Sequence, residues 1–220
     1  MTNLNQQILK FDHEQNFKDQ DFYVSNSNKH SFSLLKSWPK WDKNFINLIG
    51  ENFSGKSHLI NIFLEKYKGI KINSEDINNN FLQKIKIYEN IVLEDLTEKI
   101  NENLLFTLIN IIDQDNKYLI LTSKAPIVEF KFKLNDLNSR SSNFILSQIE
   151  KPGDDLIYAL ILKNLSDRQI SIDKKLIDFI IKRIDRTYSK ISDFIYKIDE
   201  ISLKRKKPID FKIIKEALED

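Results

Sequence analysis

One short segment, GENFSGKS at residues 50–57, constrains the fold of this chain more than any other feature. It fits the pattern Gly-x-x-x-x-Gly-Lys-Ser without a gap, and two of the chain's four glycines stand at the two required positions. An apolar run at residues 45–49 precedes it, and the apolar positions of residues 57–67 recur with helical spacing. A chance match in a chain of this size has a probability on the order of one percent. The segment therefore predicts a strand, a phosphate-binding loop (P-loop) and a helix in succession.

Each position of this loop has a chemical purpose. Glycine lets the backbone turn and approach phosphate oxygens closely, and the amides that follow point at the anion. Lys56 is placed to reach the β- and γ-phosphates, and the Ser57 hydroxyl is placed to bind Mg²⁺. We therefore expect ADP or ATP with Mg²⁺ as the ligand. The expected nucleotide-binding residues of this stretch are Gly50, Glu51, Asn52, Phe53, Ser54, Gly55, Lys56, Ser57 and His58.

A second candidate element of the site is the pair of acids in IVLEDL, at residues 91–96. Acids that follow an apolar strand beside a P-loop hold the metal and orient the attacking water. We expect Glu94 to serve the metal and Asp95 the water; the alternative is a pair of solvated acids at a strand end. The usual order is Asp then Glu, so each carboxylate is displaced by about one methylene. Intrinsic ATP hydrolysis is therefore expected to be weak or absent.

The composition excludes several other classes. The chain has no cysteine and its three histidines are scattered, so thiolate and histidine metal sites are not expected. The net charge of +2 argues against a surface devoted to nucleic acid. No apolar run approaches the roughly 18 residues of a membrane span, and the polar N-terminus does not resemble a signal peptide. A soluble cytoplasmic protein without membrane contact is the expectation.

The order of the remaining segments indicates an α/β fold followed by a helical part. Alternating strands and helices favour a parallel sheet with helices on both faces. After residue 151 only helices are expected, including one capped by Asp173. The expected strands are 45–49, 70–72, 90–93, 118–122 and 144–149, and the expected helices are 30–38, 57–67, 75–87, 99–112, 154–165, 173–184, one carrying residues 191–201, and one after Pro208. The predicted divisions are a tail at 1–20, a nucleotide-binding α/β domain at 21–151 and an all-α lid at 152–220.

The order of five motifs resembles the AAA+ ATPase domain of the bacterial replication initiator DnaA. They are the P-loop, Glu94-Asp95, the strand that ends in LILTSKAP, the segment LNSR and the helical segment IDRTY. The match is closest to the shorter relatives of the Hda type, regulatory inactivators of DnaA, in their alphaproteobacterial form. The resemblance implies a P-loop AAA+ sheet sandwiched by helices, with a small helical lid.

The resemblance also implies roles for single residues. Thr122 and Ser123 match the motif called sensor 1, which responds to the γ-phosphate region. Arg140 in LNSR matches the arginine finger, which reaches the nucleotide of a neighbouring subunit; the alternative is an ordinary surface arginine. A planar, permanently charged guanidinium there stabilises the phosphoryl transition state.

The lid and the segment before the first helix carry further matches. Arg186 in IDRTY matches sensor 2, the arginine that the lid donates to the bound nucleotide, and Arg183 one turn earlier is the competing candidate. Val24, with Phe22 and Tyr23, matches the segment that packs near the base. Core packing by residues 22–24 is an equal alternative and is compatible with base contact.

The resemblance further implies a motif for the DNA polymerase sliding clamp near the N-terminus. Gln6, Leu9 and Phe11 fit Gln-x-x-Leu-x-Phe, in which the amide hydrogen-bonds in a small pocket and the apolar residues fill a hydrophobic one. Sequence-specific DNA binding is not expected, because the sequence stops after the lid. The basic residues 204–207 are expected to be a solvated helix end.

Two functional hypotheses follow from these matches. In the first, the chain is a nucleotide-binding regulator that, with the clamp, promotes ATP hydrolysis by DnaA in trans and so inhibits re-initiation. In the second, it is a stand-alone AAA+ ATPase or a DNA-associated loader or adaptor that acts in its own homo-oligomer.

Overall fold

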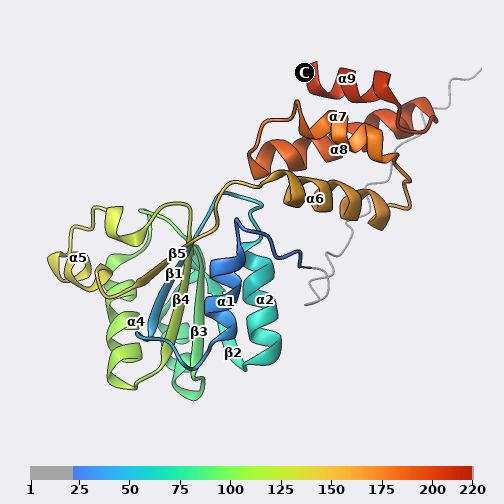
Figure 1. The fold of residues 1–220 in the computed structure, drawn as a ribbon. Coiled ribbons are helices and arrows are strands. Elements are labelled where there is room, and N and C mark those ends of the chain that lie inside the picture. Colours follow the sequence, from blue (N-terminus) through green and yellow to red (C-terminus); the bar gives the residue numbers. More distant parts are fainter. Residues whose placement is uncertain (1–21, 220) are drawn as a thin grey trace, which may run out of the picture.

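The computed structural model describes residues 22–219, which form a parallel sheet followed by a group of helices (Figure 1). The sheet has five strands in the order β2-β3-β4-β1-β5, and every neighbouring pair is parallel. Parallel strands place their carboxyl ends at one edge, where α/β proteins bind ligands. The strands are β1 (Phe45–Ile49), β2 (Gly69–Asn73), β3 (Asn90–Leu96), β4 (Tyr118–Ser123) and β5 (Ile145–Gln148).

Helices cover both faces of this sheet. Figure 1 shows α1 and α2 on one side, and α4 and α5 on the other. The helices are α1 (Lys29–Lys36), α2 (Lys56–Lys66), α3 (Asn79–Lys84), α4 (Glu102–Gln114) and α5 (Asn135–Ser141), and the short 3-10 helices are η2 (Ser74–Asp76), η3 (Ile85–Ile87) and η4 (Ile127–Glu129).

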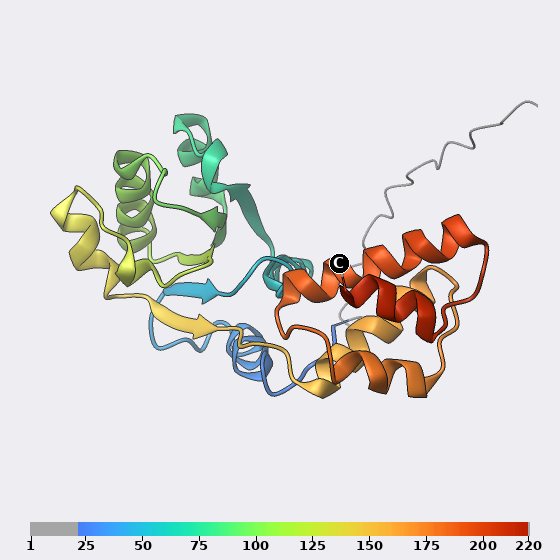
Figure 2. The same ribbon diagram turned by 90° about the horizontal axis from the view of Figure 1, so that it is seen from above.

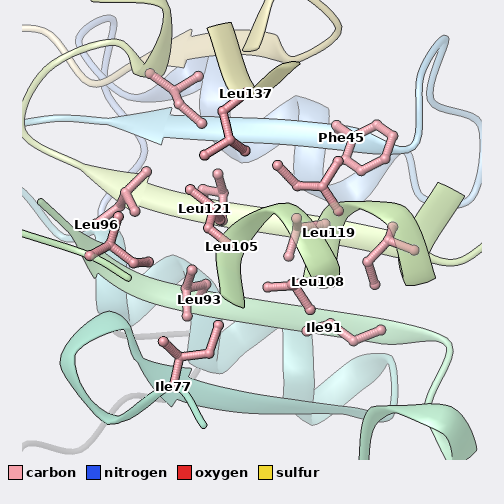
Figure 3. Close-up of a cluster of buried hydrophobic side chains, with 14 of the residues drawn as sticks. Phe45, Ile77, Ile91, Leu93, Leu96, Leu105, Leu108, Leu119, Leu121 and Leu137 are labelled. Carbon is pink, nitrogen blue, oxygen red and sulfur yellow. The ribbon is translucent and has the colours of Figure 1, made fainter. Parts of the chain in front are cut away.

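The alternation of side chains along each strand divides the core between the two faces. Ile91 and Leu93 of β3 belong to the cluster that packs against α3, α4 and α5, part of which Figure 3 shows. Val92, between them, packs instead with Leu59 and Phe63 of α2. Since both of their faces are covered, the inner strands β1, β3 and β4 are largely apolar, as expected for a parallel sheet.

Helices α6 (Asp154–Asp167), α7 (Lys174–Ile181), α8 (Tyr188–Arg205) and α9 (Phe211–Glu219) have a core of their own. Figure 2 shows them, in orange to red, grouped beyond one end of the sheet. The side chains of Asp173 and Thr187 accept backbone N–H groups at the starts of α7 and α8, so each cap satisfies a donor that the helix leaves free. Leu156 and Tyr188 pack into the α1–α2 cluster and join the two parts.

The predicted fold class is confirmed, and the expected elements differ from the structure mainly at their ends. The helix expected over residues 75–87 is interrupted, because the Asn78 side chain accepts from Phe81 N and starts a new helix, α3. Strand β3 continues past Leu93 through both acids to Leu96. The domain limits after residues 20 and 151 stay predictions. Within the described range, no helix is long and apolar enough to cross a membrane.

Candidate functional site

The P-loop lies between the carboxyl end of β1 and the first residue of α2, Lys56. Its two glycines occupy positions that disfavour a side chain. A Cβ on Gly50 would lie 2.6 Å from Ser54 Oγ, and Gly55 has φ +94°, in the left-handed region. The pattern of two glycines read from the sequence therefore has a direct steric cause.

Phe53, between the two glycines of the P-loop, has a backbone conformation that usually favours glycine. It also has a positive φ, 64°, although it carries a bulky side chain, and that side chain is 65% exposed. For a residue with a Cβ, the left-handed conformation costs about 1–2 kcal/mol. The loop thus holds local strain beside the phosphate-binding backbone.

Lys56 is buried and folded onto the loop that precedes it. Its Nζ donates to the carbonyls of Gly50 and Glu51, each at 2.8 Å. Burial lowers the pKa of Lys56 below its usual value, and the charge of Asp95 opposes that shift. Phosphate oxygens could replace the two carbonyls as acceptors, and their negative charge would favour the buried ammonium.

Two serine hydroxyls of this region, those of Ser54 and Ser57, are candidates for ligand contacts. The hydroxyl of Ser54 is buried and has no hydrogen-bond partner among residues 22–219. Ser57 lies in the first turn of α2 and is exposed. A buried polar atom without a partner is uncommon in native proteins and marks a place where a ligand or water can bind.

Asp95 is held at a β-bulge of β3. The register shifts between Leu93 and Leu96, and Asp95 has φ 55°. Its N–H donates to Thr122 Oγ1 at 2.9 Å, its carbonyl accepts from Ser74 Oγ at 2.6 Å, and its carboxylate accepts from Asn73 Nδ2 at 3.4 Å. Strands β2 and β4 therefore both anchor this acid.

Glu94 has one oxygen engaged and one unengaged. Its Oε2 lies 3.3 Å from Lys71 Nζ, whereas its Oε1 is buried without a partner in the described part of the chain. No cluster of three or more His, Cys, Asp or Glu is found among those residues. Ser57 and the unengaged oxygen of Glu94 fit Mg²⁺, which takes few protein oxygens and fills its remaining positions with phosphate oxygens and water.

Ser123, expected to act as sensor 1, is engaged in the protein interior. Its hydroxyl accepts from Asn47 Nδ2 at 2.8 Å and donates to the carbonyl of Ala125 at 2.7 Å. Thr122 is the residue of this pair that contacts Asp95. The sequence did not lead us to expect Asn47, Asn73 or Lys71 near the site. Their polar side chains within the mostly apolar segments of β1 and β2 could have indicated them.

The lid approaches the P-loop through the start of α8. Tyr188 N donates to Glu51 Oε2 at 3.3 Å, and Tyr188 Oη donates to the carbonyl of Glu150 at 2.9 Å. Burial raises the pKa of Tyr188, so this phenol stays protonated and able to donate. Arg186, two residues earlier, pairs with Asp154 at 2.6 Å, and both side chains are exposed.

Arg183, the competing sensor 2 candidate, lies over the ring of Phe179 at 3.7 Å. Its Nη1 also donates to the carbonyl of Phe179 at 3.2 Å. This side chain is thus bound to α7, whereas Arg186 pairs across the lid with the first residue of α6.

Arg140 lies away from the P-loop, on α5. Its Nη1 is 3.4 Å from Asp113 Oδ2, and its guanidinium lies 5.6 Å from the ring centre of Phe106, so α4 holds it in place. The arginine lines a surface hollow of about 500 Å³. Helices α4 and α5 cover one face of the sheet and α2 covers the other, so the structure does not bring Arg140 to Lys56 of the same chain.

The segment before α1 borders the P-loop on its other side. The Phe22 ring stacks on Phe32 and meets His58 edge-on, with centroids 5.7 and 5.2 Å apart. Tyr23 and Val24 are exposed. The predicted clamp-binding residues Gln6, Leu9 and Phe11 lie outside the described residues.

No protein-family model matches the chain. Chromosomal replication initiator protein DnaA of Campylobacter jejuni (strain 81116) is 26% identical over 93% of this chain and 52% of its own length. The chain thus spans about half the length of these initiators. An uncharacterised protein of Haemophilus influenzae is 25% identical, over 90% of this chain and 92% of its own length.

Solved structures of DnaA share the fold of this chain. Domain III of Thermotoga maritima DnaA superposes with a TM-score of 0.75 at 16% identity, covering 93% of this chain and 96% of that one. AMPPCP-bound DnaA from Aquifex aeolicus superposes with a TM-score of 0.68 at 20% identity, covering 85% and 67%. The P-loop, the fold and these sequence relatives agree: over most of its length this chain is similar to DnaA-type AAA+ proteins.

Proposed function

We propose that the chain binds ADP or ATP with Mg²⁺ at the edge formed by the P-loop, Glu94 and Asp95. Lys56 would exchange its two carbonyl partners for phosphate oxygens, while Ser57 and Glu94 would hold the metal. The metal would neutralise phosphate charge when bound. Support comes from the buried oxygens of Ser54 and Glu94, which have no hydrogen-bond partner among the described residues, and from the AMPPCP bound by Aquifex aeolicus DnaA.

Lys56→Ala tests this site. It should abolish the heat that calorimetry detects when ADP or ATP is added with magnesium, because the variant loses the charge-assisted contacts to phosphate. Lys66→Ala, at the last turn of α2, is the matched control and should bind as the wild type does. Equal binding by wild type and Lys56→Ala would contradict the assignment.

The function that we propose for the whole chain is regulation of replication initiation. With the sliding clamp, it would stimulate ATP hydrolysis by DnaA and so oppose re-initiation. The observation that carries this proposal is the position of Arg140: it is half-buried on the sheet face opposite α2, and Asp113 and Phe106 hold it there. An arginine in that place is suited to the nucleotide of a neighbour rather than to its own.

Arg140→Ala should leave nucleotide binding by this chain unchanged and should remove the stimulated hydrolysis by DnaA. Where arginine fingers act, their loss lowers the rate by roughly 10³–10⁵. The assay follows phosphate release from ATP-bound DnaA with clamp loaded on DNA. Arg205→Ala, which removes a lid arginine paired with Glu216, is the control. Stimulation by Arg140→Ala at the wild-type rate would refute the role.

Tethering to the clamp is the second part of this proposal, with Gln6, Leu9 and Phe11 as the contacts. Replacing all three with alanine should abolish capture of the purified clamp and leave nucleotide affinity unchanged. Capture at the wild-type level would remove the clamp from the proposal.

One observation favours the alternative of a stand-alone ATPase or loader acting in its own oligomer. The backbone and carboxylate of Asp95 are held by Thr122, Ser74 and Asn73, as a residue that orients water requires. Steady ATP turnover by the purified chain, lost in Lys56→Ala and unaffected by clamp or DnaA, would favour this alternative over the regulator.

A further inference from the structure

Lys71, on the edge strand β2, is a charged residue that the nucleotide site described above does not use. Its Nζ lies 3.3 Å from Glu94 Oε2 and donates to Asn61 Oδ1 at 2.8 Å. The side chain of Lys71 is 41% exposed and that of Glu94 is 15% exposed. The ammonium therefore has two fixed partners, one on β3 and one on α2.

The position of Lys71 follows from the register of the sheet. Lys71 is the partner of Val92, which faces α2, and Glu94 follows Val92 by two residues and so shares that face. Asn61 comes four residues after Ser57, so the two lie one turn apart on one side of α2. Lys71 thus pairs with one protein group that fits the metal, Glu94, and donates to a residue one helical turn from the other, Ser57.

We propose that Lys71 is a resident counter-ion of Glu94, which competes with Mg²⁺ for this carboxylate and sets how strongly nucleotide binding depends on magnesium. This inference rests on the proposed nucleotide site. In the free protein the ammonium neutralises Glu94 and leaves only Oε1 available. A metal ion arriving at Glu94 meets a carboxylate whose charge is already balanced.

The size of the effect follows from electrostatics. A divalent cation on the unengaged oxygen of Glu94 would lie about 6 Å from the ammonium, given Mg–O distances of about 2.1 Å. With the dielectric constant of water, the repulsion at that separation corresponds to about a tenfold loss of Mg²⁺ affinity. Salt screens the repulsion and partial burial of Glu94 strengthens it, so about tenfold is the expected size of the effect.

The test measures the affinity of the purified full chain for fluorescent ADP over a series of Mg²⁺ concentrations. Lys71→Met should lower the Mg²⁺ concentration at half-effect by about tenfold, and its ADP affinity in EDTA should match that of the wild type. Lys71→Arg, which keeps the charge, should behave as the wild type. Lys40→Met is the surface control, since Lys40 precedes the amino end of β1, opposite the nucleotide edge.

A double-mutant cycle shows whether Lys71 acts through Glu94. In a Glu94→Gln background, Lys71→Met should no longer change the Mg²⁺ dependence. If Lys71→Met needed the same Mg²⁺ concentration as the wild type for a half-maximal change in ADP affinity, the proposal would be overturned. A loss of ADP affinity in EDTA would also overturn it, since it would identify Lys71 as a phosphate ligand.

Failure of the underlying nucleotide site looks different: wild type would show no ADP binding that Lys56→Ala removes. A thermal melt of Lys71→Met checks its fold. Because the side chain is partly exposed on an edge strand, the melting temperature should stay within about 2 °C of wild type.

Discussion

Replacing Asn47 with alanine should destabilise the protein severely, although Asn47 is not expected to touch the nucleotide. Asn47 is fully buried in the middle of β1. Its Oδ1 accepts from Ile127 N at 2.8 Å, and its Nδ2 donates to Ser123 Oγ at 2.8 Å. Through these two bonds it connects β1 to the segment that leaves β4 at the nucleotide edge.

The magnitude follows from the groups that the substitution would leave without partners. The N–H of Ile127 would become a buried donor with no acceptor, which costs about 1–3 kcal/mol. The lost bond to Ser123 and the small cavity add about 1 kcal/mol each. We therefore expect a loss of about 3–5 kcal/mol in the free energy of unfolding. At about 2–4 °C per kcal/mol for a chain of this size, the melting temperature should fall by about 10 °C.

Urea unfolding of Asn47→Ala, followed by far-UV circular dichroism, measures this loss. Asn44→Ala is the control, because Asn44 is bonded through its side chain to Asn116 at an exposed site and its loss should cost less than about 0.5 kcal/mol. If the two variants lost equal stability, or if Asn47→Ala lost less than about 1 kcal/mol, the structural role of Asn47 would be refuted.

Three further predictions concern the loops around the site. Phe53→Gly should be more stable than Phe53→Ala by about 1 kcal/mol in urea unfolding, because alanine keeps the strain at φ 64° and glycine does not; equal stability would contradict that strain. Burial lowers the pKa of Lys56, so between the folded and the unfolded pKa the unfolded chain binds more protons than the folded one, and stability rises with pH. In urea unfolding from pH 7 to 10, the wild type should therefore gain stability relative to Lys56→Met. A stability difference that does not change with pH would contradict this. The N–H groups of Lys133 and Leu134 donate to Glu102 and lower its pKa, so these hydrogen bonds are lost as the pH falls through the pKa of Glu102 in the folded protein. Amide hydrogen exchange of Lys133 and Leu134 should accelerate at that pH in the wild type and be fast at every pH in Glu102→Ala. Exchange in Glu102→Ala that matched the wild type would disprove the contact.

The sequence alone determined the features that depend on neighbouring residues. The strand, P-loop and helix around Lys56 could be predicted directly, because the turn requires glycine at positions 50 and 55 and both lie in one short segment. The alternation of apolar strands with helices was enough to predict a parallel sheet and a helical part after it. Caps could also be read, since Asp173 satisfies a donor two residues away.

Only the tertiary structure decided which distant residues share the edge of the sheet. Lys71 meets Glu94, and Thr122 meets Asp95, because β3 lies between β2 and β4, and no pattern within one segment encodes that strand order. The same holds for Arg140, whose separation from Lys56 depends on which face of the sheet α5 covers. Local spacing reflects the geometry of a single turn, whereas charge pairs across strands depend on the register and order of the whole sheet.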